Sequence, residues 1–229
     1  NPGLVLGIRS PAFTDFIEQL RGHMADQPAQ TMLNPGTLRS YDKGLQRLLA
    51  HPGIEHLSGA RQQGNQAQPQ LFEADVSLLL EQDELLQEEV FGPCTVVVRV
   101  DDAEQLLQAV NALRGQLTAT LLADEQDLAD HGSLLGALEV KVGRVLLNGY
   151  PTGVEVCDAM VHGGPYPATS DARGTSVGTL AIDRFLRPVC YQNIPDAMLP
   201  PALQNANPLG IQRLVDGQPS TAALNQTGN

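Results

Sequence analysis

The middle of the chain alternates apolar runs with helical patterns of apolar residues. The leucines and valines that follow Asp101–Asp102 and Asp124 recur every three or four residues, which predicts two helices, the second ending at Gly143. Strands that are apolar along their whole length are typical of a parallel sheet buried on both faces. The pattern therefore predicts an α/β fold, a mostly parallel sheet with helices on both faces. The predicted strands of this part are 95–100, 117–123 and 145–148.

The amino-terminal part fits the same layered architecture. The apolar run at 4–8 predicts a strand, and Ser10 followed by Pro11 predicts the start of a helix, because a hydroxyl caps the first turn and proline suits its first position. Further along, the pattern predicts a second helix capped by Thr37, a short strand at 54–57, an exposed polar loop at 58–70 and an extended segment at 71–80.

Residues 88–93 read Glu-Glu-Val-Phe-Gly-Pro and directly precede a predicted strand. Two adjacent carboxylates, an aromatic ring two positions on and a Gly-Pro turn predict a rigid corner at the entrance to the sheet. Such a corner can hold a carboxylate and a ring against a ligand that lies outside the sheet.

From Asn148 the chain becomes rich in glycine, proline and hydroxyl residues. A long irregular segment in a compact domain is usually functional, and this one begins at the carboxyl end of a predicted parallel strand, where open α/β sheets bind ligands. A short helix is predicted at 176–185. A strand is predicted at 187–193, where Val189 and Tyr191 alternate with polar residues.

Composition and charge narrow the range of possible functions. The chain has 229 residues, 42% of them hydrophobic and 17% charged, as in a globular protein. A net charge of −12 with only 14 Lys and Arg argues against nucleic acid, and no apolar run approaches the roughly 18–20 residues of a membrane span. Three widely spaced cysteines favour reduced thiols in the cytoplasm, with Cys94 as a small buried apolar residue.

The sequence has no complete catalytic set of its own. Metal-binding spacings of His and Cys are absent, and so are the glycine-rich phosphate-binding motifs and the Gly-x-Ser-x-Gly motif of serine hydrolases. We therefore predict neither a metal site nor a catalytic residue within these 229 residues.

The Glu-Glu-Val-Phe-Gly-Pro corner resembles a motif of the aldehyde dehydrogenase superfamily. That resemblance implies that Glu89 accepts hydrogen bonds from the nicotinamide ribose of NAD or NADP and that Phe91 packs on the ribose and ring. It extends along most of the chain and is sharpest at 88–93 and 148–178. There it is closer to a branch that oxidises α-ketoglutaric semialdehyde, although a branch acting on long-chain aldehydes also remains open.

The same resemblance implies an aldehyde channel along the irregular segment. His162 stands where many relatives have an aromatic residue, so it is either a wall of the channel or a loop histidine bonded to the main chain. The other residues expected to approach the aldehyde are Pro151, Thr152, Gly153, Val154 and Val156.

Family resemblance also implies what lies outside this sequence. The chain opens Asn-Pro-Gly and enters a strand at once, so the nucleophilic cysteine, which forms the thiohemiacetal and thioester, is expected upstream with the main dinucleotide-binding domain. We expect a carboxyl-terminal part of an aldehyde-oxidising enzyme that is inactive alone. The alternative is a truncated, non-catalytic relative that serves as a binding or assembly module.

We divide the chain into a catalytic-domain part, 1–186, and a terminal part, 187–229. By the same resemblance, the strand at 187–193 is expected to join a small oligomerisation sheet, which implies a homodimer or homotetramer of the full-length enzyme.

Overall fold

The computed structural model describes residues 2–60, 64–81 and 83–224. The chain forms two compact units, Asn1–Arg184 and Phe185–Asn229.

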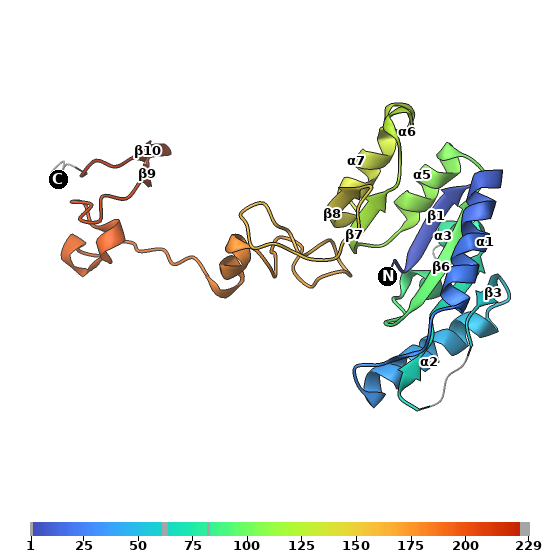
Figure 1. Ribbon diagram of the computed structural model, residues 1–229. Coiled ribbons are helices and arrows are strands. Elements are labelled where there is room, and N and C mark those ends of the chain that lie inside the picture. The colour runs from blue at the N-terminus through green and yellow to red at the C-terminus, as the bar shows by residue number, and fades with distance from the viewer. Residues whose placement is uncertain (1, 61–63, 82, 225–229) are drawn as a thin grey trace. The chain divides into compact units, whose positions relative to one another are not determined.

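A four-stranded sheet forms the centre of the first unit, in the order β1-β6-β5-β3 (Figure 1). Strands β1 (Leu4–Ile8) and β5 (Gln70–Ala74) both run parallel to β6 (Cys94–Val100) between them. The last strand, β3 (Ile54–Ser58), pairs antiparallel with β5.

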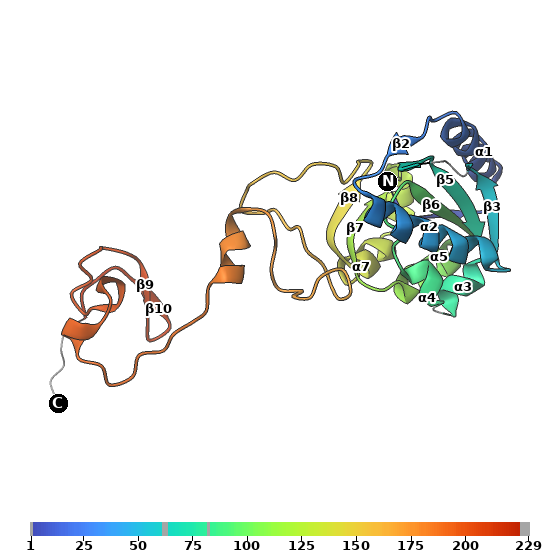
Figure 2. The same cartoon turned by 90° about the horizontal axis from the view of Figure 1, so that it is seen from below.

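Helices cover both faces of this sheet, as Figure 2 shows with α1 on one side and α3 and α5 on the other. Because side chains alternate along a strand, Val97 of β6 meets Ile17 of α1 (Pro11–Ala25) on one face. On the other face, Val96 and Val98 pack in a larger core with residues of α2 (Pro35–Ala50), α3 (Val76–Leu80) and α5 (Ala103–Ala112). The predicted α/β architecture is confirmed.

Two further strands form a parallel pair in the same unit. Strand β7 (Gln116–Leu121) pairs with β8 (Val142–Leu147), and α6 (Glu125–Asp130) and α7 (Ser133–Glu139) connect them. Leu134 and Leu138 of α7 pack with Val110 of α5 in a third apolar cluster, which Leu6 of β1 also contacts.

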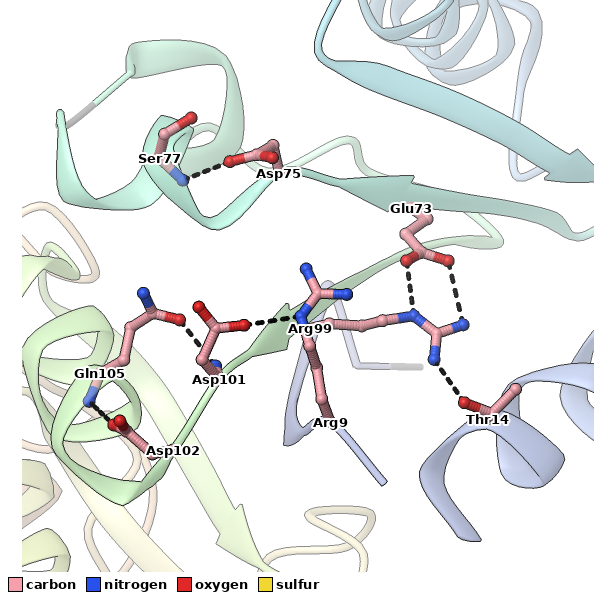
Figure 3. A network of polar contacts seen from close by, with 9 residues as sticks. All are labelled: Arg9, Thr14, Glu73, Asp75, Ser77, Arg99, Asp101, Asp102 and Gln105. Atoms are coloured by element: carbon pink, nitrogen blue, oxygen red, sulfur yellow. Dashed lines mark hydrogen bonds and ion pairs between the residues drawn. The ribbon is translucent and has the colours of Figure 1, made fainter. Parts of the chain in front are cut away.

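A charged network lies at the carboxyl ends of the central parallel strands (Figure 3). The Arg99 guanidinium donates to both carboxylate oxygens of Glu73, at 2.6 and 3.4 Å, and to the Thr14 hydroxyl of α1 at 2.9 Å. Beside it, Arg9 donates to Asp101 at 2.8 Å. These contacts join the carboxyl ends of β1, β5 and β6 to one another and to α1. Residues 88–93 enter the sheet at the opposite, amino end of β6.

Helix starts follow the sequence rules, with one correction. The Ser10 hydroxyl accepts from the Phe13 amide at 3.1 Å and α1 begins at Pro11, as predicted. The second helix begins earlier than predicted, because Asn34 caps it by accepting from the Thr37 amide at 2.9 Å. Thr37 therefore lies inside the helix.

Three other boundaries differ from the prediction. The extended segment expected at 71–80 ends at Ala74, because the Asp75 side chain accepts from the Ser77 amide and starts α3. The single helix expected after Asp124 is two helices, and Gly143 lies inside β8 instead of ending a helix. Within the predicted loop at 58–70, of which 61–63 lie outside the described residues, β4 (Gln66–Ala67) pairs with β2 (Gln30–Thr31).

The predicted strand at 187–193 is wrong: the structure gives this segment no strand. Alternation of apolar and polar residues does not by itself make a strand, which needs a hydrogen-bonded neighbour. The helix predicted at 176–185 is a 3₁₀ helix, η1 (Thr179–Phe185), which the boundary between the units crosses.

The second unit is made of short elements. Two 3₁₀ turns, η2 (Asp196–Met198) and η3 (Pro201–Leu203), precede a hairpin of β9 (Arg213–Val215) and β10 (Gln218–Ser220). The buried Asn207 side chain donates to the main chain of Ile211 and Thr221.

In the described part of the chain, no helix is both long and apolar enough to cross a membrane.

Candidate functional site

Residues 88–93, which we call the acidic corner, connect α4 (Glu84–Gln87) to β6 and lie directly on α2. A Cβ atom added to Gly44 of α2 would stand 2.9 Å from a methyl carbon of Val90. A Cβ atom added to Gly92 would stand 2.4 Å from the ring of Tyr41. The helix and the corner are therefore in direct contact at two alternate residues of the corner.

A third contact joins the first residue of the corner to the same helix. Glu88 forms an ion pair with Arg47, and both side chains are about half exposed. Since Glu88 is extended (φ −89°, ψ 134°), the residue after it points to the opposite side.

Glu89 and Phe91 alternate along the acidic corner with the residues that contact α2. Glu89 is exposed, and Phe91 leaves 63% of its surface in solvent. A pocket of about 170 Å³ lies where α2 meets the corner; Lys43, Gly44, Arg47, Glu88, Glu89 and Val90 are in its wall, and Phe91 is not. A carboxylate that accepts hydrogen bonds and a ring that packs suit a ligand with hydroxyl groups and a flat face.

The end of the acidic corner is fixed to the sheet. The Tyr41 hydroxyl donates to the Pro93 carbonyl at 3.0 Å, and the Gln70 amide of β5 donates to the same oxygen at 2.8 Å. Burial raises the pKa of Tyr41 far above its ordinary value of 10.0, so its hydroxyl remains a donor.

Cys94 follows the corner and is buried, as predicted. Burial raises the pKa of its thiol from 9.0 to about 12, which leaves it protonated at neutral pH and unsuited to nucleophilic attack.

The chain enters β1 beside the acidic corner. The Thr95 hydroxyl donates to the Pro2 carbonyl, and the Val96 amide donates to the Gly3 carbonyl, each at 2.9 Å. Both contacts lie at the amino ends of β1 and β6. Residues 2–3 and the acidic corner therefore lie at the same end of these two strands.

Residues 149–165, which we call the fold-back segment, leave β8 at its carboxyl end and return along it. Asn148 makes the turn with a positive φ of 48°, and its side-chain amide both donates to and accepts from the main chain of Ala123. Arg144 of β8 then donates to the carbonyls of Pro151 at 2.8 Å and Gly153 at 3.4 Å.

Close main-chain contacts fix the far end of the fold-back segment. A Cβ atom at Gly143 would stand only 2.0 Å from the Gly163 carbonyl oxygen, and one at Gly115 only 2.1 Å from that of Pro165. Only glycine permits this approach. The segment thus starts at the carboxyl ends of β7 and β8, as predicted, but ends beside their amino ends.

The residues predicted to line an aldehyde channel all lie on the fold-back segment. The exposed ones are Pro151, Thr152, Gly153 and Val156; the half-buried ones are Val154 and His162.

His162 is held through its main chain. Its amide donates to the Thr175 hydroxyl at 2.8 Å, and its carbonyl accepts from the amide and hydroxyl of Ser176, each at 3.0 Å. These bonds fix the position of the residue and do not involve its ring, so both interpretations of the side chain stay open.

The predicted site residues therefore fall into two groups, one on the acidic corner and one on the fold-back segment. No hydrogen bond or ion pair within the described residues joins the two groups. The residues that hold them, Tyr41, Gly44, Arg47 and Arg144, were not predicted from the sequence to belong to the site. Arg144 could have been noticed as a lone cation inside an otherwise apolar strand pattern.

A wider, open pocket of about 530 Å³ lies where the fold-back segment meets the starts of β7 and β8, and Gly115, Lys141 and Tyr166 are in its wall. The Lys141 ammonium donates to the carbonyls of Asn111 and Leu113, so it caps α5. None of the predicted site residues lines this pocket. Among the described residues, no group of three or more His, Cys, Asp and Glu could hold a metal ion.

The chain is similar to known dehydrogenases in sequence and in fold. The chain is 55% identical over 218 residues to an alpha-ketoglutaric semialdehyde dehydrogenase of Acinetobacter baylyi, covering 94% of this chain but 41% of that relative. Among solved structures, the Delta-pyrroline-5-carboxylate dehydrogenase of Mycobacterium tuberculosis has a TM-score of 0.65 at 17% identity, over 86% of this chain and 39% of the other. An NAD+ complex of an aldehyde dehydrogenase from Bacillus cereus has a TM-score of 0.59 at 18% identity, over 80% and 37%.

These structural likenesses concern the fold. A model of the aldehyde dehydrogenase family matches residues 19–172, which include the acidic corner, β6 to β8 and the whole fold-back segment. On this match, over more than half of its length, the chain belongs to the aldehyde dehydrogenase family.

Proposed function

We propose that this chain supplies the nicotinamide-ribose contacts and part of the aldehyde channel of an NAD(P)-dependent dehydrogenase that oxidises α-ketoglutaric semialdehyde to a carboxylic acid. The observation that carries the proposal is the joint exposure of Glu89 and Phe91 on a corner whose other residues are held by α2. The relative of that name, 55% identical over nearly the whole chain, supports the substrate.

The residues of the acidic corner fit a nicotinamide nucleotide. Glu89 presents a carboxylate that can accept from both ribose hydroxyls, and Phe91 presents a ring that can pack on the sugar and the nicotinamide. When bound, the nucleotide supplies a ring that takes up a hydride. The protein's part is to fix the direction of that transfer, since correct orientation lowers a barrier without any proton transfer. The proposal covers NAD and NADP alike.

The fold-back segment supplies the aldehyde side in this proposal. Pro151, Thr152, Gly153, Val154 and Val156, together with His162, face the acyl part of the substrate. Because this chain spans less than half of its relative's length, the nucleophile and base belong to the longer protein that we propose to contain it. The 229-residue chain alone is expected to oxidise no aldehyde.

Glu89→Gln in the longer protein tests the cofactor role. Loss of the charged acceptor should cost about 1–3 kcal/mol, so single-turnover hydride transfer should slow by roughly 5- to 150-fold. The matched control is Glu125→Gln, which removes an exposed carboxylate from the first turn of α6. Equal hydride-transfer rates in the Glu89 and Glu125 variants would refute the proposal.

We also propose that the longer protein is a cytoplasmic homodimer or homotetramer. Val189 and Tyr191 are 56% and 45% exposed, and apolar side chains so placed favour contact with another subunit. The two exposed cysteines, Cys157 and Cys190, form no disulfide, which fits a reducing compartment. Light scattering of the longer protein with and without Val189→Asp tests the assembly: a monomeric wild type would contradict it.

A further inference from the structure

One face of α2 matches the acidic corner residue by residue. Tyr41, Gly44 and Arg47 recur at intervals of three, which places them on one side of the helix. They meet alternate residues of the corner in reverse order: the Tyr41 ring lies against Gly92, Gly44 against Val90, and Arg47 is paired with Glu88.

The three contacts have consequences for the two residues between them. Glu88 is extended, and successive side chains of an extended segment point to opposite sides, so contacts of 88, 90 and 92 with the helix favour an outward direction for 89 and 91. Both residues are exposed, and Glu89 also borders the pocket that Lys43, Gly44 and Arg47 of α2 line, so the position of α2 bears directly on the corner.

We infer that Tyr41, Gly44 and Arg47 are positioning residues for cofactor binding: they set the direction of Glu89 and Phe91 without touching the nucleotide. The inference rests on the proposed function, because it assigns these residues to the nicotinamide side of that site. It predicts that changes on this face of α2 alter hydride transfer while leaving aldehyde binding unchanged.

The variant Gly44→Ala distinguishes a positioning role of α2 from a purely stabilising one. In a helix interior alanine is more favourable than glycine, so the helix propensity of Gly44→Ala should by itself stabilise α2. Its new Cβ would stand 2.9 Å from Val90, too close without a shift of the corner. A variant that is at least nearly as stable as the wild type but slower in hydride transfer is the result that a merely structural role would not give.

The variant Arg47→Ala provides a second test that distinguishes positioning of the corner from global stability. An ion pair between half-exposed side chains contributes little to global stability, so Arg47→Ala should leave the melting temperature nearly unchanged. If the pair directs the corner, hydride transfer should slow on the order of tenfold, because small displacements of reacting groups are costly. Exchanging the charges, Arg47→Glu with Glu88→Arg, should recover most of the loss.

The experiment compares Gly44→Ala, Arg47→Ala, the charge exchange and the control Arg39→Ala, an exposed arginine on the same helix. Each is made in the longer protein and measured for melting temperature, single-turnover hydride transfer and the KM of the aldehyde. Hydrogen exchange of 88–92 reports on the corner directly.

Slower hydride transfer and faster exchange in the Gly44 and Arg47 variants, with Arg39→Ala and the aldehyde KM unchanged, would support the inference. If Glu89→Gln slows hydride transfer and the α2 variants do not, the inference is wrong while the proposed function stands. If Glu89→Gln itself has no effect, the proposed function fails, whatever the exchange shows.

Discussion

The acidic corner and the fold-back segment are held in opposite ways. Side chains of α2 hold the corner, through a buried tyrosine, an ion pair and a valine packed on a glycine. The fold-back segment is held mainly through main-chain atoms: carbonyls that accept from Arg144 and carbonyls that glycines approach closely. Contacts between side chains thus dominate at the corner, whereas contacts to main-chain carbonyls dominate at the fold-back segment.

This difference governs how each region responds to substitution. A changed side chain on α2 can be compensated by a matching change on the corner, because both partners are variable groups. A side chain added at Gly115, just before β7, or at Gly143 of β8 meets a carbonyl oxygen, which no substitution can remove. We therefore expect the fold-back segment to tolerate less change where it is attached.

Gly143→Ala should have the largest effect. Its Cβ would stand 2.0 Å from the Gly163 carbonyl, so the segment must move, and overpacking of this kind costs about 1–3 kcal/mol of unfolding free energy. Denaturant unfolding measures the cost, and in the longer protein the KM of the aldehyde should rise. Gly136→Ala is the control, because nothing lies within 4 Å of its added Cβ and α7 should gain stability. If the two variants unfold alike, the contact with Gly163 is not restrictive.

Arg144→Ala should have a smaller and more local effect. Two carbonyls lose a charged donor, which should loosen 151–160 by about 1–2 kcal/mol and raise the aldehyde KM several-fold. Cofactor binding should not change, because Arg144 contacts no residue of the acidic corner in the described part of the chain. Steady-state kinetics and hydrogen exchange measure this, with Arg173→Ala, whose side chain is 94% exposed, as the control. A rise in the cofactor KM equal to that of the aldehyde would mean that the two regions are coupled.

The smallest effect concerns the cysteines. Burial raises the Cys94 pKa to about 12, so the folded form resists ionisation that the unfolded chain undergoes near 9.0. The resulting stabilisation is complete below pH 9 and is lost as the pH rises from 9 to 12, by roughly 1 kcal/mol at pH 9.5. Cys94→Ser should weaken this dependence in pH-resolved melting curves.

Thiol labelling at pH 8 supplies the matching comparison. Exposed Cys157 and Cys190 should react quickly, while Cys94 should react only after unfolding. Rapid labelling of all three thiols in the folded protein would show that the start of β6 opens readily.

The sequence predicted what depends on neighbours along the chain. The apolar run of β6, the Ser10 cap and the parallel architecture were predicted, because periodicity and capping are local signals. The boundary of α2 was misplaced by choosing Thr37, although Pro35 is better suited to the first helical position after an Asn34 cap. The Asn34-Pro35 pair is therefore the local signal that marks this helix start.

Other features were not predictable in the same way. The role of α2 depends on contacts between residues about 40 to 50 positions apart, and the return of the fold-back segment depends on glycines whose neighbours are far along the chain. Val189 and Tyr191 alternate as in a strand, but pairing depends on a partner that no local pattern supplies. The candidate residues could be named from the motif, whereas their supports required the three-dimensional arrangement.

The two attachments of the fold-back segment have a consequence for how a substrate range can change. Arg144 holds the carbonyls of Pro151 and Gly153, and Gly143 and Gly115 receive those of Gly163 and Pro165, so both ends are fixed by groups that do not depend on the intervening side chains. The residues between, such as Val154 and Val156, can then be exchanged without shifting the frame. A library randomised at 154–156 should yield many folded members with altered aldehyde preference, whereas one randomised at the attachments should yield few.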